Sequence, residues 1–221
     1  MSRKGVSIVL ALFVSAGFIE SHAADFRLTG LAGYNGGLGV RVSTMASGFA
    51  TGFPLAIELG IGYASLDPGD PWASRKIFIN DNTNGTPENS GWAWDFRLDF
   101  LYRTALLGMN DSYLYAGVRR SLFTADFKFV GGNEDFEIRS NQWGLGVGAR
   151  GAFPIGARVE FMVTAGLDYY FSTTLEGHDT AYGPDGLVIN GRENFTFTDA
   201  DAAVNQPKLQ PVGLVGISLK L

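Results

Sequence analysis

Charged side chains occupy alternate positions in one segment of the sequence, between residues 94 and 103. Asp95, Arg97 and Asp99 alternate there with large apolar residues. Successive side chains of a β-strand point to opposite faces, so a strand would place these charges together on one face. Carboxylates and guanidinium groups gathered in this way form charge-assisted hydrogen bonds with one another, or they line a path for ions.

Other alternating segments carry further charges opposite their apolar residues. If the segments close into a membrane barrel, the charged face points inward, and an eight-stranded barrel is only wide enough for its own side chains. Buried charges must be paired, and the mixed signs allow pairing. We therefore predict a lumen charge network that plugs the barrel, with an ion path as the alternative. Its predicted members are Arg27, Arg41, Glu58, Asp95, Arg97, Asp99, Arg103, Arg119, Arg150, Arg158, Glu160 and Asp168.

A single histidine, His178, remains after residue 23 and lies in the sequence Glu176-Gly177-His178-Asp179. Barrel enzymes that act on acyl chains use a histidine with a serine or an acid, and no serine lies at a motif spacing from His178. Its glycine and acidic neighbours predict a loop, away from the apolar band. We expect no catalytic residue and no enzymatic activity. A weak metal site formed by Glu176, His178 and Asp179 is the alternative.

The asparagine-rich stretch 80–85 superficially resembles a calcium-binding loop. Such a loop begins with an aspartate and has a bidentate glutamate at its twelfth position. Asn80 and Gly91 occupy these positions here, so we interpret the stretch as a surface turn. We expect no cofactor and no metal.

Alternation with a period of two also predicts the elements that position the charges. Eight segments show it, and an even number of strands is typical of a bacterial transmembrane barrel. Near Arg119 and Arg120 the apolar phase slips, which indicates a bulge or the end of the lipid-facing part. The predicted strands are 26–34, 38–44, 55–63, 94–103, 113–129, 142–150, 158–171 and 213–221.

The connections between these strands differ in length. If the first strand runs outward, the two long connections, 67–91 and 172–207, both fall on the outward side. Short periplasmic turns and longer extracellular loops are typical of transmembrane barrels. Within 187–192, the pair Asn190-Gly191 is typical of a tight turn, so we expect a small hairpin that protrudes above the barrel.

The first 23 residues are typical of an export signal. Arg3 and Lys4 precede an uncharged run, 5–19, and Ser21-His22-Ala23 supplies the small residues of a cleavage site. A run of this length is too short to span a bilayer comfortably, although an N-terminal anchor helix is the alternative. We predict a signal peptide over 1–23 and one mature domain over 24–221.

Composition narrows the choice of function further. The chain has no cysteine, which excludes disulfides and lipid attachment through an N-terminal cysteine. Removing Arg3, Lys4 and Glu20 with the signal leaves 15 basic and 21 acidic residues, a net charge of −6, and no basic block stands out. We therefore expect no nucleic-acid partner.

The apolar face of each strand could meet lipid, or it could fill a soluble lipocalin-like barrel. The polar faces are rich in glycine, which suits a narrow interior, and the chain has five lysines against twelve arginines. Soluble strand surfaces tend to use lysine, whereas arginine is the better partner for confined carboxylates. We therefore predict that the apolar face meets lipid. The predicted lipid-facing residues are Trp94, Phe96, Leu98, Phe100, Trp143, Leu145, Phe161, Val163, Val215, Ile217, Leu219 and Leu221.

The last segment ends on Val215, Ile217, Leu219 and Leu221, four apolar residues at alternate positions. In this strand and in its architecture, the mature chain resembles the small outer-membrane β-barrels of Gram-negative bacteria, typified by the membrane domain of OmpA and by OmpX. Strands of that family usually end in an aromatic residue, whereas this chain ends in Leu221. The resemblance implies location in the cell outer membrane, contact with its lipid and lipopolysaccharide, and insertion by the barrel-assembly machinery.

The sequence thus predicts an all-β protein, an eight-stranded antiparallel up-and-down transmembrane β-barrel, most simply a monomer. We expect a structural or surface-interaction role in which the long loops contact surface partners and the lumen is plugged. A narrow channel or carrier for small or apolar solutes is the alternative.

Overall fold

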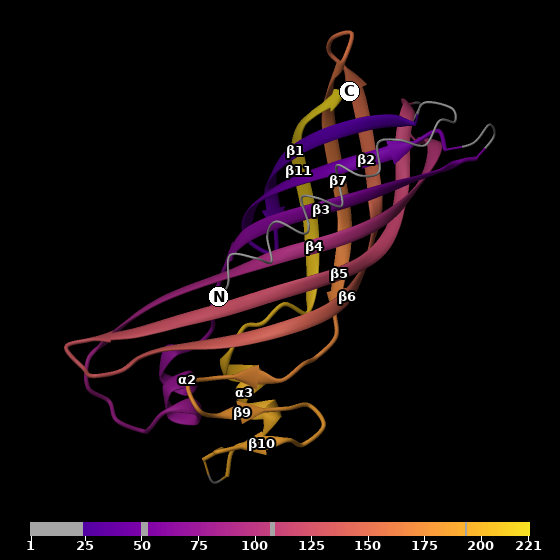
Figure 1. The fold of residues 1–221 in the computed structure, drawn as a ribbon. Helices are drawn as coiled ribbons and strands as arrows, with labels where there is room; N and C mark the ends of the chain where they lie inside the picture. Colours follow the sequence, from indigo (N-terminus) through magenta and orange to yellow (C-terminus); the bar gives the residue numbers. More distant parts are fainter. Residues whose placement is uncertain (1–23, 50–52, 107–108, 193) are drawn as a thin grey trace, which may run out of the picture.

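The computed structural model describes residues 24–49, 53–106, 109–192 and 194–221 and shows a closed antiparallel β-barrel (Figure 1). The predicted signal peptide, 1–23, lies outside the described residues. The barrel strands are β1 (Asp25–Asn35), β2 (Leu38–Ser47), β3 (Leu55–Leu66), β4 (Thr86–Leu106), β5 (Met109–Val130), β6 (Asp135–Pro154), β7 (Val159–Tyr170) and β11 (Leu209–Lys220). The predicted eight-stranded fold is confirmed.

Neighbouring barrel strands pair in chain order, and β11 closes the barrel by pairing with both β7 and β1. Following paired residues from Glu160 in β7 around all eight strands leads back to β7 at Tyr170. The path returns ten residues along the strand, from 160 to 170. This stagger accompanies the tilt of the strands that closure of a sheet requires.

Strands β4, β5 and β6 continue beyond the closed barrel. The pairing of β3 with β4 ends at Gly91, and the pairing of β7 with β6 ends at Gly144. Past these points the three long strands form a projecting sheet, at the end of the barrel opposite the C-terminus (Figure 1).

The register of β5 with both of its neighbours runs through Arg119 and Arg120 without interruption, so a bulge at this position is excluded. What changes there is the apolar side of the strand. Leu114 and Val118 point outward, whereas Phe123 and Phe127 point inward and are buried. The slip in the sequence pattern therefore marks the point where the inner face of the strand passes from a polar lumen to an apolar core.

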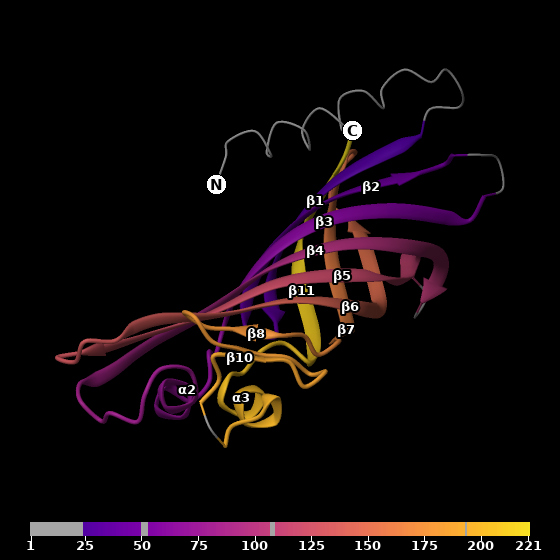
Figure 2. The same ribbon diagram turned by 60° about the horizontal axis from the view of Figure 1, so that its bottom comes forward.

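That apolar core belongs to a lobe into which the two long connections fold. The lobe contains α2 (Pro71–Phe78), β8 (Leu175–Glu176), β9 (Ala181–Tyr182), β10 (Val188–Ile189) and α3 (Phe197–Ala203). Helices α2 and α3 pack against each other below the projecting sheet (Figure 2).

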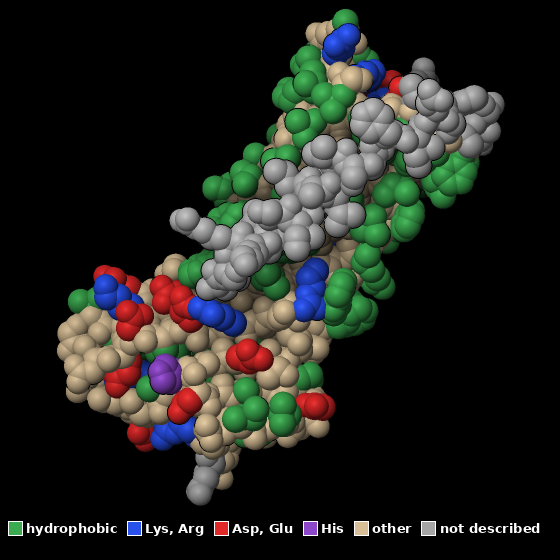
Figure 3. Space-filling model, in the orientation of Figure 1, with side chains coloured by type: hydrophobic (Ala, Val, Ile, Leu, Met, Phe, Trp, Pro, Cys, Tyr) green, Lys and Arg blue, Asp and Glu red, His purple; other side chains and the backbone are tan. Residues whose placement is uncertain are grey.

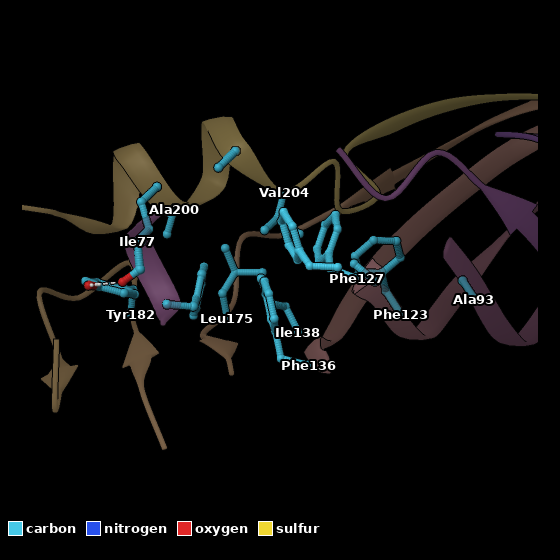
Figure 4. Packing of buried hydrophobic residues seen from close by; sticks show 14 residues of the cluster. Ile77, Ala93, Phe123, Phe127, Phe136, Ile138, Leu175, Tyr182, Ala200 and Val204 are labelled. Atoms are coloured by element: carbon cyan, nitrogen blue, oxygen red, sulfur yellow. Dashed lines mark hydrogen bonds between the residues drawn. The ribbon is translucent and has the colours of Figure 1, made fainter. Parts of the chain in front are cut away.

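The lobe core joins the loops to the strands (Figure 4). Phe127 and Ile138 extend from the projecting sheet, Ile77 from α2, Leu175 from β8 and Ala200 from α3. Each of these five side chains is buried. Because burial of apolar surface is the main source of folding free energy, the lobe has its own stabilising core apart from the lumen.

The small hairpin predicted around Asn190-Gly191 is displaced towards the N-terminus. Strands β9 and β10 pair through Tyr182 with Val188 and Ala181 with Ile189, so the turn lies at 183–187. Gly186 adopts a positive φ of 88° in this turn, a conformation that costs glycine little. Asn190 also has a positive φ, but it follows the hairpin rather than forming its turn.

Both helices have recognisable N-terminal caps. The Asp70 carboxylate accepts hydrogen bonds from the amides of Trp72 and Ala73, and Pro71 begins α2. Thr196 and Asp199 form a capping box at α3. Among the described residues, no helix has the length and apolar character needed to cross a membrane.

Candidate functional site

The inward face of the barrel brings buried charges from different strands together. The Asp168 carboxylate of β7 accepts hydrogen bonds from Arg97 Nη2 of β4 at 2.6 Å and from Arg119 Nε of β5 at 2.8 Å. All three side chains are buried. Asp168 therefore links strands that lie on different sides of the lumen.

Two more carboxylates complete this cluster. Asp99 accepts a hydrogen bond from Arg119 Nη1 at 2.7 Å, and Asp95 accepts one from Arg97 Nε at 3.0 Å. The Tyr170 hydroxyl donates to the other oxygen of Asp95 at 2.6 Å. Fully desolvated arginines are thereby held by several charge-assisted hydrogen bonds, the arrangement that makes their burial tolerable.

Further ion pairs lie along the lumen. Arg150 makes a bidentate pair with Glu58, in which Nη2 lies 2.7 Å from Oε1. Glu160 accepts a hydrogen bond from Arg27 Nη1 at 2.7 Å, and its other oxygen forms an ion pair with Lys220 Nζ at 2.7 Å. Arg27, unlike the central charges, is only partly buried.

Glycines on the inner face make room for these side chains. A Cβ added to Gly146 would lie 2.1 Å from an oxygen of Asp168 and 2.3 Å from Arg119 Nη2. A Cβ added to Gly166 would lie 2.2 Å from the Tyr115 hydroxyl. The inward glycines therefore lie where large polar side chains of neighbouring strands extend over the inner face of the wall, a close approach that a Cβ would block.

Arg41 differs from the other central arginines. Its side chain is buried, but none of its three guanidinium nitrogens has a hydrogen-bond partner within the described part of the chain. The carboxylates of Asp95 and Asp168 attract the Arg41 guanidinium group electrostatically, without a hydrogen bond. Most buried polar groups in proteins have a hydrogen-bond partner, so Arg41 is an exception within this charge network.

Two residues predicted for the network lie outside it. Arg103 is on the inward phase of β4, but its side chain is 60% exposed and pairs with Asp111 near the β4–β5 turn. Arg158 lies in the β6–β7 turn and is exposed. The alternating pattern extends past the enclosed length of the barrel, so alternation alone overstates how many charges are buried.

Conversely, Tyr115, Tyr170 and Gln142 reach the interior although they were not among the predicted residues. Gln142 donates to the carbonyl of Pro207, where the last loop returns to the barrel, at 2.8 Å. Tyr170 follows Asp168 at the next inward position of β7, so the alternating pattern could have identified it as an inward residue.

The predicted lipid-facing side chains point away from the lumen. All twelve are exposed except Leu98, which is partly exposed. Aromatic rings pair on the outer surface, with Tyr63 against Trp94 and Tyr169 against Phe171. Figure 3 shows hydrophobic side chains over the visible barrel wall, while most of the charged side chains in view gather on the lobe.

A closed eight-stranded barrel with an apolar exterior and a charged interior has the design of a transmembrane barrel. A major outer membrane protein from Thermus thermophilus is similar over 90% of this chain and 100% of its own, with 27% identity and a TM-score of 0.74. The chain is an outer-membrane-type β-barrel.

Weaker similarities exist to other solved structures. Acinetobacter baumannii CarO2 is 14% identical, with 91% of this chain and 100% of that chain covered and a TM-score of 0.47. Neisserial surface protein A is 12% identical, with the same coverage and a TM-score of 0.41. No family model matches the sequence, and no curated protein matches it.

The outer-membrane-type barrel places His178 at the surface of the lobe. The His178 side chain is 77% exposed, and its Nδ1 lies 3.9 Å from an oxygen of Asp179. In the described ranges, no group of three or more potential metal ligands comes together. The stretch 80–85 is an irregular loop in which Asn80 Oδ1 accepts the amide of Asn82 at 3.0 Å.

A second polar cluster joins α2 to the tip of the projecting sheet. Arg75 is buried and pairs with Glu134, which lies between β5 and β6. Arg75 also donates to the carbonyl of Asn84 at 2.7 Å and stacks over the ring of Phe129. Hydrogen bonds from Asn80 and from Arg75 lower the pKa of the Glu134 carboxyl below its usual value.

Proposed function

We propose that this outer-membrane barrel is a non-conducting scaffold that displays its lobe at the cell surface for contact with other molecules. The observation that carries the proposal is the lobe core, in which α2, β8 and α3 pack on the extended strands β5 and β6. A loop that only closes a turn has no need of a shared apolar core. A folded lobe offers a rigid surface, and rigidity reduces the entropy that binding costs.

The direction in which the lobe faces follows from the topology. The C-terminal end of β11 and the short β6–β7 turn lie at one end of the barrel, and the lobe lies at the other (Figure 1). Transmembrane barrels have their short turns in the periplasm and their longer loops outside. The lobe end is therefore the extracellular end in our proposal.

The lumen supports the non-conducting part of the proposal. Arg97, Arg119 and Asp168 are held across the bore by direct hydrogen bonds, and Arg150 is held by Glu58. An ion would have to displace these pairs in a space of low dielectric, where their attraction is strong. A narrow channel is the second candidate, and the unpartnered Arg41 is the observation that favours it.

Conductance of the refolded protein in a planar bilayer tests the plug. We expect no steady single-channel openings. Steady openings in the native protein, lost when Arg41 is replaced by Gln, would overturn the plug and support the channel.

Surface labelling tests the display of the lobe, because the chain has no cysteine of its own. His178→Cys places a thiol on the lobe, and Arg158→Cys places one at the exposed turn of the opposite end. A membrane-impermeant maleimide added to intact cells should label the first variant at once and the second only after permeabilisation. The reverse order would show that the lobe faces the periplasm.

A further inference from the structure

We propose that Arg120, stacked on Trp143, binds the phosphate group of an outer-leaflet glycolipid on the outside of the barrel. The assignment of the lipid to the outer leaflet depends on the orientation proposed above, whereas the phosphate-binding chemistry of Arg120 does not. The proposal assigns the expected contact with outer-membrane lipid to particular residues.

Arg120 is unusual in its position. It points outward from β5, opposite Phe96 of β4 and Trp143 of β6. Within the described residues of the closed barrel, no other outward-facing strand position carries a charge. The remaining outward charges of β4, β5 and β6, such as Lys128 and Arg139, lie on the projecting sheet.

The charge of Arg120 has no protein counterpart. No ion pair or hydrogen bond joins its guanidinium group to another described residue, and its contact is with the Trp143 ring, 4.7 Å from the centroid. A cation over an indole face is favourable, and the edge of the guanidinium plane stays free. That edge presents a fork of N–H groups that matches two oxygens of one phosphate.

The surroundings suit a lipid rather than a soluble anion. Phe96, Val118 and Leu145 lie exposed on the same outer surface and offer contact to acyl chains. On β6 the outward residues change from Leu145 and Trp143 to Asn141 and Arg139. On β5 itself, Leu122 is the last outward apolar residue before Thr124 and Asp126. Arg120 thus lies one outward position inside the lobe-side border of the apolar band, close to the level at which lipid headgroups begin, and tryptophan is enriched at such borders.

The test measures lipid retained by the refolded full chain. The protein is inserted in phosphatidylcholine nanodiscs that contain a minor fraction of lipid A bearing both phosphates, and bound lipid A is counted by native mass spectrometry. Arg120→Gln should lower retention roughly tenfold, the effect expected for losing one charge-assisted hydrogen-bonded contact. Trp143→Leu should give a smaller loss, because it removes only the stacking that orients Arg120.

Arg139→Gln is the matched control, since Arg139 also points outward but is exposed and paired with Glu137. It should retain lipid A as the native protein does. Fully dephosphorylated lipid A is a second control, in which the lipid and not the protein is changed. The native protein should retain it no better than Arg120→Gln does. Equal retention of the two lipids by the native protein, or undiminished retention of lipid A by Arg120→Gln, would overturn the site. Neither result depends on the cysteine labelling, so the two proposals fail separately.

Discussion

Asp168 accepts hydrogen bonds from two arginines that belong to two different strands. Its carboxylate is completely buried, so its free energy depends on those two partners rather than on water. At the scale of single residues, the lumen is held by such shared partners: Arg119 in turn also binds Asp99, and Arg97 also binds Asp95. Removing one member of the network therefore leaves a buried charge without its partner.

We predict that Asp168→Asn destabilises the folded barrel by about 3–5 kcal/mol, the usual cost of breaking a buried ion pair from one side. Urea titration followed by the heat-modifiable band in gel electrophoresis measures this change. Asp111→Asn is the control, because its partner Arg103 is exposed and such pairs contribute about 0–1 kcal/mol. Similar midpoints for the two variants would mean that the lumen is well hydrated.

At the scale of elements, a single strand can have two surroundings. Leu98 is an outward residue of β4 within the closed barrel, and Ser90 is an outward residue of β4 within the projecting sheet. Both positions are on the same face of the same strand. Only the tertiary arrangement distinguishes them, since one lies in the apolar band and the other opposite Asp126.

Leu98→Arg should reduce folding into lipid vesicles strongly, because a charge near the midplane of a barrel costs roughly 2–4 kcal/mol. Ser90→Arg should fold almost as the native protein does, since it adds a charge outside the apolar band and next to Asp126. The folded fraction at equal lipid concentration measures both. Equal tolerance of the two changes would contradict the assigned membrane level.

Helix α2 is attached to the tip of the projecting sheet by the pair of Arg75 and Glu134. The pKa of Glu134 is lowered in the folded lobe, first by the hydrogen bond from Asn80 and then by that from Arg75. The folded lobe therefore binds this proton less readily than the unfolded lobe. The resulting stabilisation is present above the ordinary glutamate pKa of about 4.3 and is lost as the pH falls through the lower value.

Acidification below about pH 4 should accordingly increase proteolysis in the segment 67–85 more than in the barrel, as measured with an acid-active protease. Glu134→Gln should be more sensitive than the native lobe at neutral pH and should lose much of this pH dependence. A native lobe whose cleavage does not change with pH would show that the pair does not hold α2.

At the scale of the whole molecule, two cores are stacked along one set of strands. The lumen core contains the buried ion pairs together with small apolar clusters, and the lobe core is apolar and rich in aromatic rings. β5 contributes Arg119 to the first and Phe123 to the second. The two cores have few side chains in common, so the lobe should be able to lose its packing while the barrel stays folded.

Leu175→Ala tests this separation, because Leu175 is fully buried in the lobe core. The change should destabilise the lobe locally by about 2–5 kcal/mol. Protease should then cut within 172–207 while the heat-modifiable band of the barrel remains. Loss of that band together with lobe cleavage would mean that the molecule folds as one cooperative unit.

The sequence by itself determined the barrel. Period-two alternation is a local property, because neighbouring side chains of a strand must point to opposite faces, and it was readable for Asp95, Arg97 and Asp99 without any knowledge of their partners. The same local property identified the outward positions, such as Phe96 and Ile217. Where the connections are short, as between β1 and β2 or between β6 and β7, pairing in chain order then follows, because a short connection joins antiparallel neighbours.

Only the tertiary structure decided which charges are buried and what the long loops do. Alternation assigns a side chain to a face, but enclosure depends on where the neighbouring strands end, and this is why Arg103 and Arg158 lie in solvent. The lobe core joins residues as distant as Ile77 and Ala200, whose contact no local pattern encodes. The apparent slip at Arg119 and Arg120 had the same origin, since the backbone kept its phase while the surroundings of the strand changed.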